Sequence, residues 1–298
     1  MSVYNIDGNN LSTLYNKNGQ SIMSAYNVDG NVVFPGEVDY TNYSYVTQWA
    51  SKGISPAQGF DIYDDKVFWI NKEGNSSASA KMYVFNLSDG SQALDTAYVT
   101  ADTWHGNSIA IDYPLMYASA AYLPSEVFVN TFAQDYSATM SYKLIIDDNS
   151  RNCDVCLDPD DNNIMWTLGH SADSSNLSAP FIISKWDLSD LTDNGDGTYT
   201  PNLLQTVTTP QPSTSFYFQE CRIHDGIMWY CSGNGSGPSY VYGVSPTTGE
   251  RLYTIDLQTS TEPEGLVFYP DSNAPGGFAL YVGFQGMALR KYTFAPAN

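Results

Sequence analysis

A short apolar and aromatic triplet recurs five times along this chain and constrains its fold more than any other feature. Each copy has two apolar residues followed by Tyr or Trp: Val67-Phe68-Trp69, Leu115-Met116-Tyr117, Ile164-Met165-Trp166, Ile227-Met228-Trp229 and Ala279-Leu280-Tyr281. The aromatic positions lie 48, 49, 63 and 52 residues apart. Strand repeats of this length are typical of propeller blades. We therefore predict an all-β fold, a five-bladed β-propeller.

The composition agrees with strands, since the 298 residues include 23 Tyr, 13 Phe and 6 Trp. Aromatic residues favour strands, whereas Asn, Asp and Gly serve turns. We expect each blade to begin with an innermost strand: Gly59–Ile62, Ser108–Ile111, Asp154–Leu157, Glu220–Ile223 and Gly265–Phe268. The last blade has only three strands before the final residue. Residues 42–49 are therefore predicted to supply its fourth strand and to close the ring.

A second, shorter repeat occupies the first 33 residues. Asp7-Gly8, Asn18-Gly19 and Asp29-Gly30 recur at a spacing of 11 residues, and such dipeptides favour two-residue hairpin turns. A hairpin this short cannot bury its apolar face alone, so it must stack on other hairpins, on the propeller or on neighbouring chains. We favour neighbouring chains in an oligomer, a homotrimer. The prediction is a β-hairpin stalk over residues 1–40 and a propeller over residues 41–298.

Charge excludes several kinds of partner. The formal net charge is −20, with 12 Lys and Arg residues, so phosphate backbones and anionic membrane surfaces are disfavoured. No stretch approaches the roughly 20 apolar residues that span a bilayer, and the N-terminus lacks the pattern of a signal peptide. The four Cys residues, at 153, 156, 221 and 231, lack zinc-ribbon spacing. We expect buried free thiols, with a disulfide or metal site as the alternative.

Polar residues recur just before the innermost strands. Four positions before the aligned residues Ile62, Ile111, Leu157, Ile223 and Phe268 lie Gln58, Asn107, Cys153, Gln219 and Glu264; six positions before them lie Pro56, His105, Arg151, Tyr217 and Glu262. Because innermost strands line the axis, these residues should ring one channel mouth. Converging polar groups suit a polar ligand, but mutual pairing with trapped water would explain them equally well.

The ligand-binding residues predicted from this alignment are Gln58, His105, Asn107, Arg151, Tyr217, Gln219, Glu262 and Glu264. Trp104 joins them because it directly precedes His105, and an exposed indole suits stacking on the apolar face of a sugar ring. The alternative for Trp104 is a loop residue packed under its own blade. The neutral, hydroxyl-rich ligand that such a mouth favours is a sugar.

Catalytic and metal motifs are weak. The sequence has no HExxH and no GxSxG, and no catalytic residue is predicted. Glu262 and Glu264 are an acid pair that could serve a glycosidase, although a partner carboxylate cannot be placed from sequence. No cofactor is expected. The oxygen-rich segments Asp158–Asn162 and Asp193–Gly197 lack the closing Glu of an EF-hand, so we expect solvated turns, with calcium as a weak alternative.

Four segments carry a family resemblance: Gln58-Gly59-Phe60, His105-Gly106-Asn107, Gln219-Glu220 and Glu262-Pro263-Glu264-Gly265-Leu266. They resemble the starts of blades in five-bladed propellers of receptor-binding proteins from phages that infect Gram-positive bacteria, a group to which helveticin-like bacteriocins look related. The resemblance covers residues 55–298. It implies binding of a cell-surface polysaccharide or wall teichoic acid without cleavage, with Gln58, His105, Asn107, Gln219, Glu262 and Glu264 at the mouth. The hairpin stalk departs from the long helical stems of those phage proteins.

We accordingly predict a phage tail receptor-binding or tail-tip protein that contacts other virion tail proteins. It would be located in the virion tail and be extracellular after release by lysis. Two alternatives remain open. One is an extracellular enzyme that degrades glycans by hydrolysis or elimination on the same scaffold, and the other is a purely structural virion or surface protein.

Overall fold

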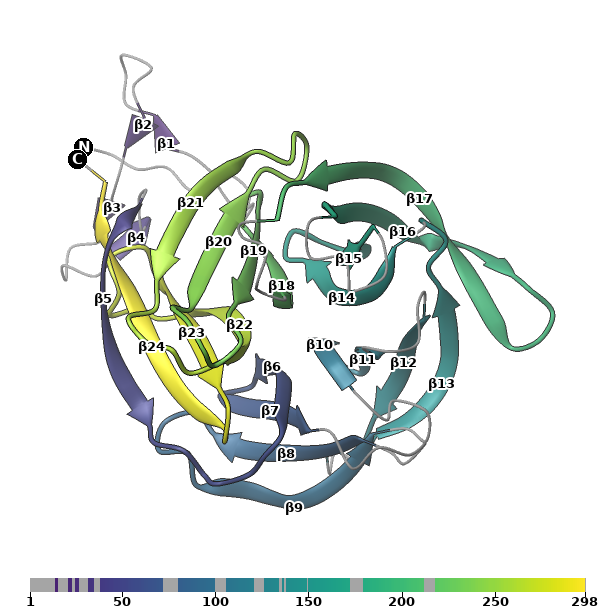
Figure 1. The fold of residues 1–298 in the computed structure, drawn as a ribbon, viewed down its shortest axis with the longest axis horizontal. Coiled ribbons are helices and arrows are strands. Elements are labelled where there is room, and N and C mark those ends of the chain that lie inside the picture. Colours follow the sequence, from purple (N-terminus) through teal and green to yellow (C-terminus); the bar gives the residue numbers. More distant parts are fainter. Residues whose placement is uncertain are drawn as a thin grey trace.

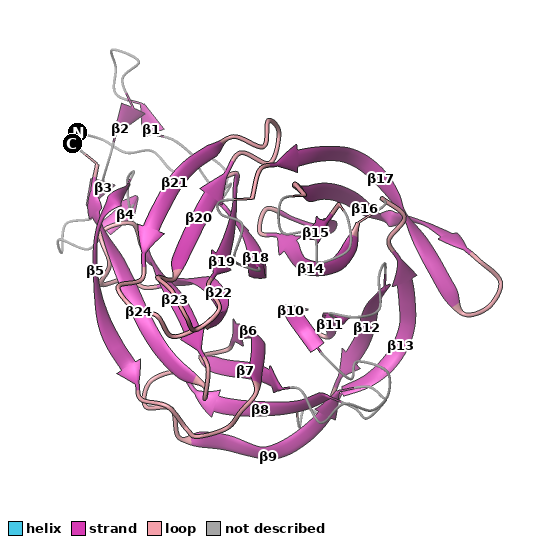
Figure 2. Cartoon of the chain, in the orientation of Figure 1, coloured by secondary structure: helices cyan, strands magenta, loops and turns pink. Residues whose placement is uncertain are grey.

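The computed structural model consists of β-strands joined by turns. It describes residues 14–15, 21–22, 25–26, 32–34, 38–71, 80–99, 106–120, 126–133, 136, 138–148, 150–171, 179–211 and 218–297. Within these residues every regular element is a strand and no helix occurs, as Figure 2 shows. The all-β prediction is therefore confirmed for the described part of the chain.

After residue 56 the strands follow one another in antiparallel runs of four. The first run is β6 (Ala57–Tyr63), β7 (Lys66–Asn71), β8 (Ala80–Asn86) and β9 (Gln92–Val99). The second is β10 (Gly106–Asp112), β11 (Leu115–Ala120), β12 (Glu126–Phe132) and β13 (Ala138–Ile145). The third is β14 (Arg151–Asp158), β15 (Asp161–His170), β16 (Phe181–Asp193) and β17 (Thr198–Thr209). The fourth is β18 (Phe218–His224), β19 (Ile227–Ser232), β20 (Tyr240–Val244) and β21 (Arg251–Asp256).

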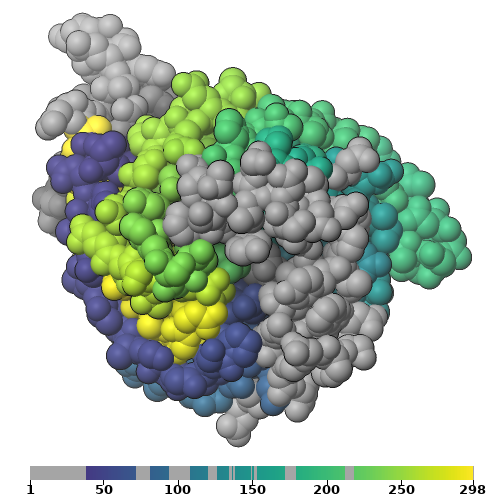
Figure 3. All heavy atoms as spheres, viewed as in Figure 1, coloured from purple at the N-terminus to yellow at the C-terminus, as the bar shows by residue number. Residues whose placement is uncertain are grey.

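The second and third runs are joined into one sheet of eight strands. Their outer strands β13 and β17 pair in parallel, with Lys143 opposite Thr198 and Leu144 opposite Tyr199. β16 and β17 then continue beyond the ring as a long hairpin, which protrudes at the right of Figures 1 and 3. Its turn contains the oxygen-rich segment Asp193–Gly197, which is exposed and whose Asp side chains accept bonds from backbone N–H groups two residues ahead. The segment is thus an exposed turn, as the sequence predicts.

The last run is completed by a strand from the start of the chain. It comprises β22 (Pro263–Pro270), β23 (Phe278–Phe284), β24 (Ala288–Pro296) and β5 (Val38–Trp49). β5 pairs antiparallel with β24, from Leu289 opposite Trp49 to Pro296 opposite Val38. The segment 42–49, from which the sequence predicts this strand, lies within β5. The Tyr40 hydroxyl also donates to Asp225 Oδ2 at 2.6 Å, which ties β5 to the neighbouring run.

The first strands of the runs lie around a common centre, as Figure 1 shows. They contact one another in cyclic order, β6 to β10, β14, β18, β22 and back to β6. Each of them has a register shift near its start, between Ala57 and Phe60, Gly106 and Ile109, Arg151 and Asp154, Gln219 and Cys221, and Pro263 and Gly265. A β-bulge redirects the side chains around it, so these irregularities determine which polar groups face the centre.

The second strands supply much of the apolar core. The repeated triplets lie on β7, β11, β15, β19 and β23, and their middle residues Phe68, Met116, Met165, Met228 and Leu280 are all buried. The four Cys residues are buried and free, as the sequence predicts. Cys156 Sγ and Cys221 Sγ lie 3.8 Å apart, on β14 and β18. The core therefore lies between adjacent sheets, where the aromatic and sulfur side chains of neighbouring runs meet.

Two short strand pairs precede β5. β1 (Leu14–Tyr15) pairs with β2 (Ser21–Ile22), and β3 (Ala25–Tyr26) pairs with β4 (Val32–Phe34), which brackets the segments that contain Asn18-Gly19 and Asp29-Gly30. The predicted hairpin around Asp7-Gly8 lies outside the described residues, and the stalk stays a prediction. Among the described residues, no helix has the length and apolar character of a membrane span.

Candidate functional site

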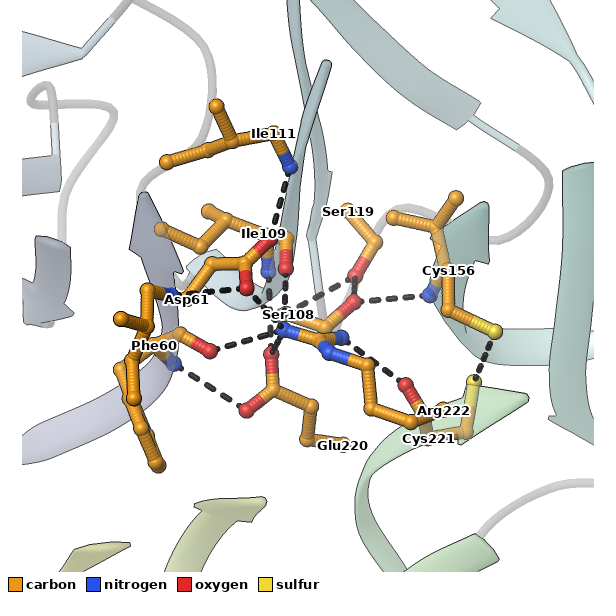
Figure 4. A network of polar contacts seen from close by, with 12 residues as sticks. Phe60, Asp61, Ser108, Ile109, Ile111, Ser119, Cys156, Glu220, Cys221 and Arg222 are labelled. Atoms are coloured by element: carbon orange, nitrogen blue, oxygen red, sulfur yellow. Dashed lines mark hydrogen bonds and ion pairs between the residues drawn. The ribbon is translucent and has the colours of Figure 1, made fainter. Parts of the chain in front are cut away.

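The centre of the ring holds a buried ion cluster, which we call the axis network: Asp61, Glu220 and Arg222 (Figure 4). Glu220 lies on the bulge of β18 with a φ of 49°, a left-handed conformation that aims its side chain at β6 and β10. Its Oε2 accepts from the Phe60 N–H at 3.1 Å and its Oε1 from the Ile109 N–H at 3.4 Å. The carboxylate therefore replaces ladder hydrogen bonds that these two strands cannot make with each other.

Arg222 completes the network from the same strand. Its Nη2 donates to Glu220 Oε1 at 2.9 Å and to the carbonyl oxygens of Phe60 and Ile109, both at 2.8 Å. Nη1 donates to the carbonyl of Cys221 at 2.9 Å. Nη2 also lies 3.6 Å from Asp61 Oδ1. One guanidinium thus neutralises two carboxylates and joins β6, β10 and β18.

Asp61 and Ser108 extend these contacts around the ring. Asp61 Oδ2 accepts from the Ile111 N–H at 2.7 Å, and Ser108 Oγ accepts from the Val155 N–H at 2.8 Å. Every carboxylate oxygen of Asp61 and Glu220 therefore accepts at least one bond. Burial raises the pKa of both acids, and the Arg222 charge opposes that shift. Because its groups are paired with one another, we interpret the axis network as structural.

A second group of polar residues, which we call the mouth cluster, lies at the starts of β6, β18 and β22 and in the turn between β23 and β24: Gln58, Gln219, Glu262, Glu264 and Gln285. Gln219 Nε2 donates to Glu262 Oε1 at 3.2 Å, and Gln285 Nε2 donates to Glu264 Oε1. The Gln285 backbone N–H donates to the Glu262 carbonyl at 3.1 Å. Ser55, three residues before Gln58, donates to Gln285 Oε1 at 3.3 Å. These bonds connect three of the four-stranded runs at one end of their innermost strands.

The mouth cluster is acidic and incompletely bonded. Glu264 is 0% exposed, and burial, with a further contribution from the charge of Glu262, raises its pKa well above the ordinary value. Burial also raises the pKa of Glu262, against the bond from Gln219. Among the described residues, Glu264 Oε2 and Gln58 Oε1 are buried without a hydrogen-bond partner. Buried polar atoms are almost always paired, so a ligand or a water molecule would complete the bonding of these two oxygens.

The structure brings together some of the predicted site residues. Gln219, Glu262 and Glu264 lie in one hydrogen-bonded group, and Gln58 lies on the bulge of the adjoining β6. For Asn107 on β10 and Arg151 on β14 only the backbone is described. Trp104, His105 and Tyr217 lie outside the described residues. These five remain predictions.

Sequence reasoning missed the axis network and Gln285. The signal for the network was present, because Asp61, Glu220 and Arg222 interrupt strands that otherwise read as core in a chain with only 15% charged residues. Charges inside such strands are almost never fully buried unless they are paired. Gln285 gave no signal, since it lies in the turn between β23 and β24, away from the repeated positions.

Chemically, the mouth cluster can do two things. Its amide and acid groups can donate to and accept from hydroxyl groups of a ligand, and Glu264 can hold a proton next to a second carboxyl group. In the described part of the chain, no three His, Cys, Asp or Glu residues converge in a way that would hold a metal ion. The amide and acid groups of the mouth cluster suit a polar organic ligand or proton transfer at this end of the ring.

Comparisons with known proteins point to the fold. No family model and no curated protein sequence matches the chain. Among solved structures, an exo-β-1,3-galactanase of Phanerochaete chrysosporium with bound β-1,3-galactotriose is similar at a TM-score of 0.51 and 12% identity, over 86% of this chain and 67% of that one. A tail fibre of a Staphylococcus aureus phage has a TM-score of 0.45 and 13% identity, over 86% of this chain. The chain spans 53% of that fibre. The likeness to the galactanase concerns the fold alone.

Proposed function

We propose that this chain is a five-bladed β-propeller that binds a bacterial cell-surface glycan without cleaving it. The successive runs of four strands and the cyclic contacts of their first strands support the propeller over residues 41–298. The observation that carries the binding proposal is the mouth cluster, in which Glu264 and Gln58 each keep a buried oxygen without a partner. Such a site gains hydrogen bonds when a ligand supplies donors.

Sugar hydroxyl groups fit these requirements because each can donate and accept at the same time. A neutral polysaccharide also avoids the repulsion that a net charge of −20 imposes on anionic ligands. A ligand hydroxyl would exchange hydrogen bonds with the partly exposed Gln219 and Glu262, and a local shift of Gln58 and Glu264 would bring their unpaired oxygens within reach of the same ligand. Trp104, His105, Asn107, Arg151 and Tyr217 belong to this proposal as further contacts around the same opening.

The biological role we propose is that of a receptor-binding or tip protein of a phage tail. It is supported by the resemblance of Glu262–Leu266 and the related segments to blade starts in phage receptor-binding proteins. A homotrimer joined through residues 1–40, attached to other tail proteins, would present several propellers at once. Multivalency then converts weak single sites into firm attachment, since the second binding event occurs at high effective concentration.

The test is adsorption of labelled protein to Gram-positive cells and to their extracted wall polymers. The double variant Gln219→Ala/Glu262→Ala removes an amide and an acid that are only partly buried, so the fold should persist. We expect its adsorption to fall about tenfold or more, equivalent to the loss of one or two hydrogen bonds to a charged group. Trp104→Ala with Glu264→Ala should abolish adsorption.

The matched control is Asn202→Ala/Glu250→Ala, which also removes an amide and an acid, from exposed positions near the outer strands β17 and β21. It should adsorb like the unaltered chain. Thermal unfolding of all variants establishes that they are folded. Equal adsorption by the mouth variants and the control would refute the site.

A glycan-cleaving enzyme is the second candidate, and one observation favours it. Glu264 is a buried acid with a raised pKa beside Glu262, which is the environment of a general acid in a glycosidase. Release of soluble reducing ends from wall polymers by the purified chain, lost in Glu264→Gln, would establish cleavage. Binding without such release supports the non-cleaving role.

A further inference from the structure

A groove with a volume of about 440 Å3 lies between the first and last runs of strands. Asp65 and Lys66 line it from the first run, Ser88 lines it from the turn after β8, and Tyr269, Asp271 and Lys291 line it from the last run. The volume falls within the range of about 300–1,000 Å3 that is usual for small-molecule sites.

This groove lies at the other end of the innermost strands from the mouth cluster. β6 and β22 lie side by side and run in the same direction. Gly265 packs against Phe60 near the starts of the two strands, and Tyr269 bonds to Asp65 near their ends. The mouth residues Gln58 and Glu264 precede the first of these contacts. The groove is therefore separate from the mouth cluster and is not explained by the proposed site.

The charges that line the groove compensate one another. Lys291 Nζ lies 2.6 Å from Asp271 Oδ2, and Lys66 Nζ lies 3.8 Å from Asp64 Oδ2. Asp65 is bonded to Tyr269, whose hydroxyl accepts from the Asp65 N–H at 3.0 Å and donates to Oδ1 at 3.1 Å. Neither a strongly anionic nor a strongly cationic ligand is favoured, because each charged group already has an opposite charge or a hydrogen bond.

Several features of the groove suit a polyhydroxylated ring. Its ammonium, carboxylate and phenol groups present fixed donors and acceptors, and the half-buried ring of Tyr269 with the exposed Pro270 adds an apolar surface. Sugars have apolar ring faces and hydroxyl edges, which match such a surface. We propose that this groove is a second carbohydrate site and binds one or two neutral sugar units. It shares with the proposed function only the class of ligand.

The test exploits two equivalent positions of the repeat. Leu87-Ser88-Asp89, in the turn after β8, and Leu188-Ser189-Asp190, within β16, have the same sequence, but only Ser88 lines the groove, and both Ser residues are exposed. Ser88→Trp fills the groove from its rim, while Ser189→Trp places the same side chain on the protruding hairpin. Galactose, N-acetylglucosamine and β-1,3-galactotriose are titrated into each full-length protein, and ligand binding is followed by amide NMR shifts.

We expect groove resonances to shift on addition of sugar in the unaltered chain, in Ser189→Trp and in Gln219→Ala/Glu262→Ala. In Ser88→Trp we expect the affinity for the same sugar to be roughly tenfold weaker or more than in the unaltered chain. Equal shifts in Ser88→Trp, no groove shift with any of the three sugars, or a shift with calcium alone would overturn the proposal. Sugar shifts confined to mouth residues would overturn it and leave the proposed function standing. Groove shifts together with normal cell adsorption by the mouth variants would support the groove as a sugar site and refute the proposed function of the mouth cluster.

Discussion

The axis network and the mouth cluster each bury a glutamate on the bulge of an innermost strand, but they compensate it differently. Glu220 and Glu264 are both 0% exposed. Glu220 accepts from two backbone N–H groups and from Arg222, whereas Glu264 accepts from Gln285 and lies near a second acid. Equal burial with unequal pairing indicates unequal roles: one acid joins strands, and the other keeps an oxygen without a partner, which the proposed glycan site would use.

The difference also shows why the ring closes around charge rather than around apolar side chains. The innermost strands contact their neighbours in the ring without a continuous ladder of hydrogen bonds between them. Buried backbone groups need partners, and Glu220, Arg222 and Asp61 supply them to Phe60, Ile109 and Ile111. A buried ion pair is not necessarily a net gain in stability, but removing one member leaves the others without compensation.

The largest effect is therefore expected for Arg222→Met, which leaves Glu220 and Asp61 as buried acids without a counter-charge. We expect the free energy of unfolding to fall by about 3–5 kcal/mol at neutral pH. Chemical denaturation followed by tryptophan fluorescence measures it. Arg290→Met is the control, because Arg290 donates to the Leu257 carbonyl and stacks on Tyr45 without neutralising a buried acid. A similar loss in both variants would contradict the role of the axis network.

A smaller and more selective effect is expected when each buried glutamate is replaced by its neutral isostere. In Glu220→Gln one of the two oxygens becomes an NH2 group that faces a donor, so we expect a loss of about 1–3 kcal/mol. In Glu264→Gln the new NH2 group can replace the oxygen that has no partner, and we expect no loss at neutral pH. The same denaturation experiment compares the two. Equal destabilisation would show that the fold depends on the mouth cluster as strongly as on the axis network.

The sequence predicted the all-β class and the positions of strands better than it predicted the buried polar groups at the centre of the ring. The recurring triplet indicated the all-β class and the second strands, and the number of strands suggested that residues 42–49 would be needed by the last sheet. These inferences succeed because aromatic periodicity and turn dipeptides act locally. The predicted stalk and trimer would depend on contacts between chains, which local patterns do not specify, and both stay predictions.

At the site, the alignment of innermost strands placed Gln219, Glu262 and Glu264 at one mouth, and the structure brings these three residues together. It could not indicate that bulges shift the register at this point, so that Glu220, one residue after the aligned Gln219, turns to the axis. A single residue in the left-handed conformation reverses the direction of a side chain, and a non-Gly residue adopts it too rarely to be predicted. Gln285 was missed for another reason, since it comes from a turn outside the repeated positions.

The smallest effect is a change in how stability depends on pH. The pKa of Glu264 is raised in the folded chain above its unfolded value of about 4.3. The folded chain therefore binds this proton more tightly, so its contribution to stability is full below about pH 4.3 and is lost as the pH rises through the folded pKa. Glu264→Gln removes this contribution. We expect the free energy of unfolding of Glu264→Gln, minus that of the unaltered chain, to increase from about pH 4 upwards.

Glu262→Gln refines the same measurement because it keeps Glu264 and removes only the neighbouring charge. Burial is the main cause of the raised pKa of Glu264 and the charge of Glu262 is the lesser one. The pH-dependent loss of stability should therefore persist in Glu262→Gln but occur at a lower pH. If Glu264→Gln left the pH profile unchanged, Glu264 would be ionised without cost in the fold. The mouth cluster would then resemble the axis network, in which every carboxylate oxygen is already bonded, and Glu264 would have no unpaired oxygen for a ligand.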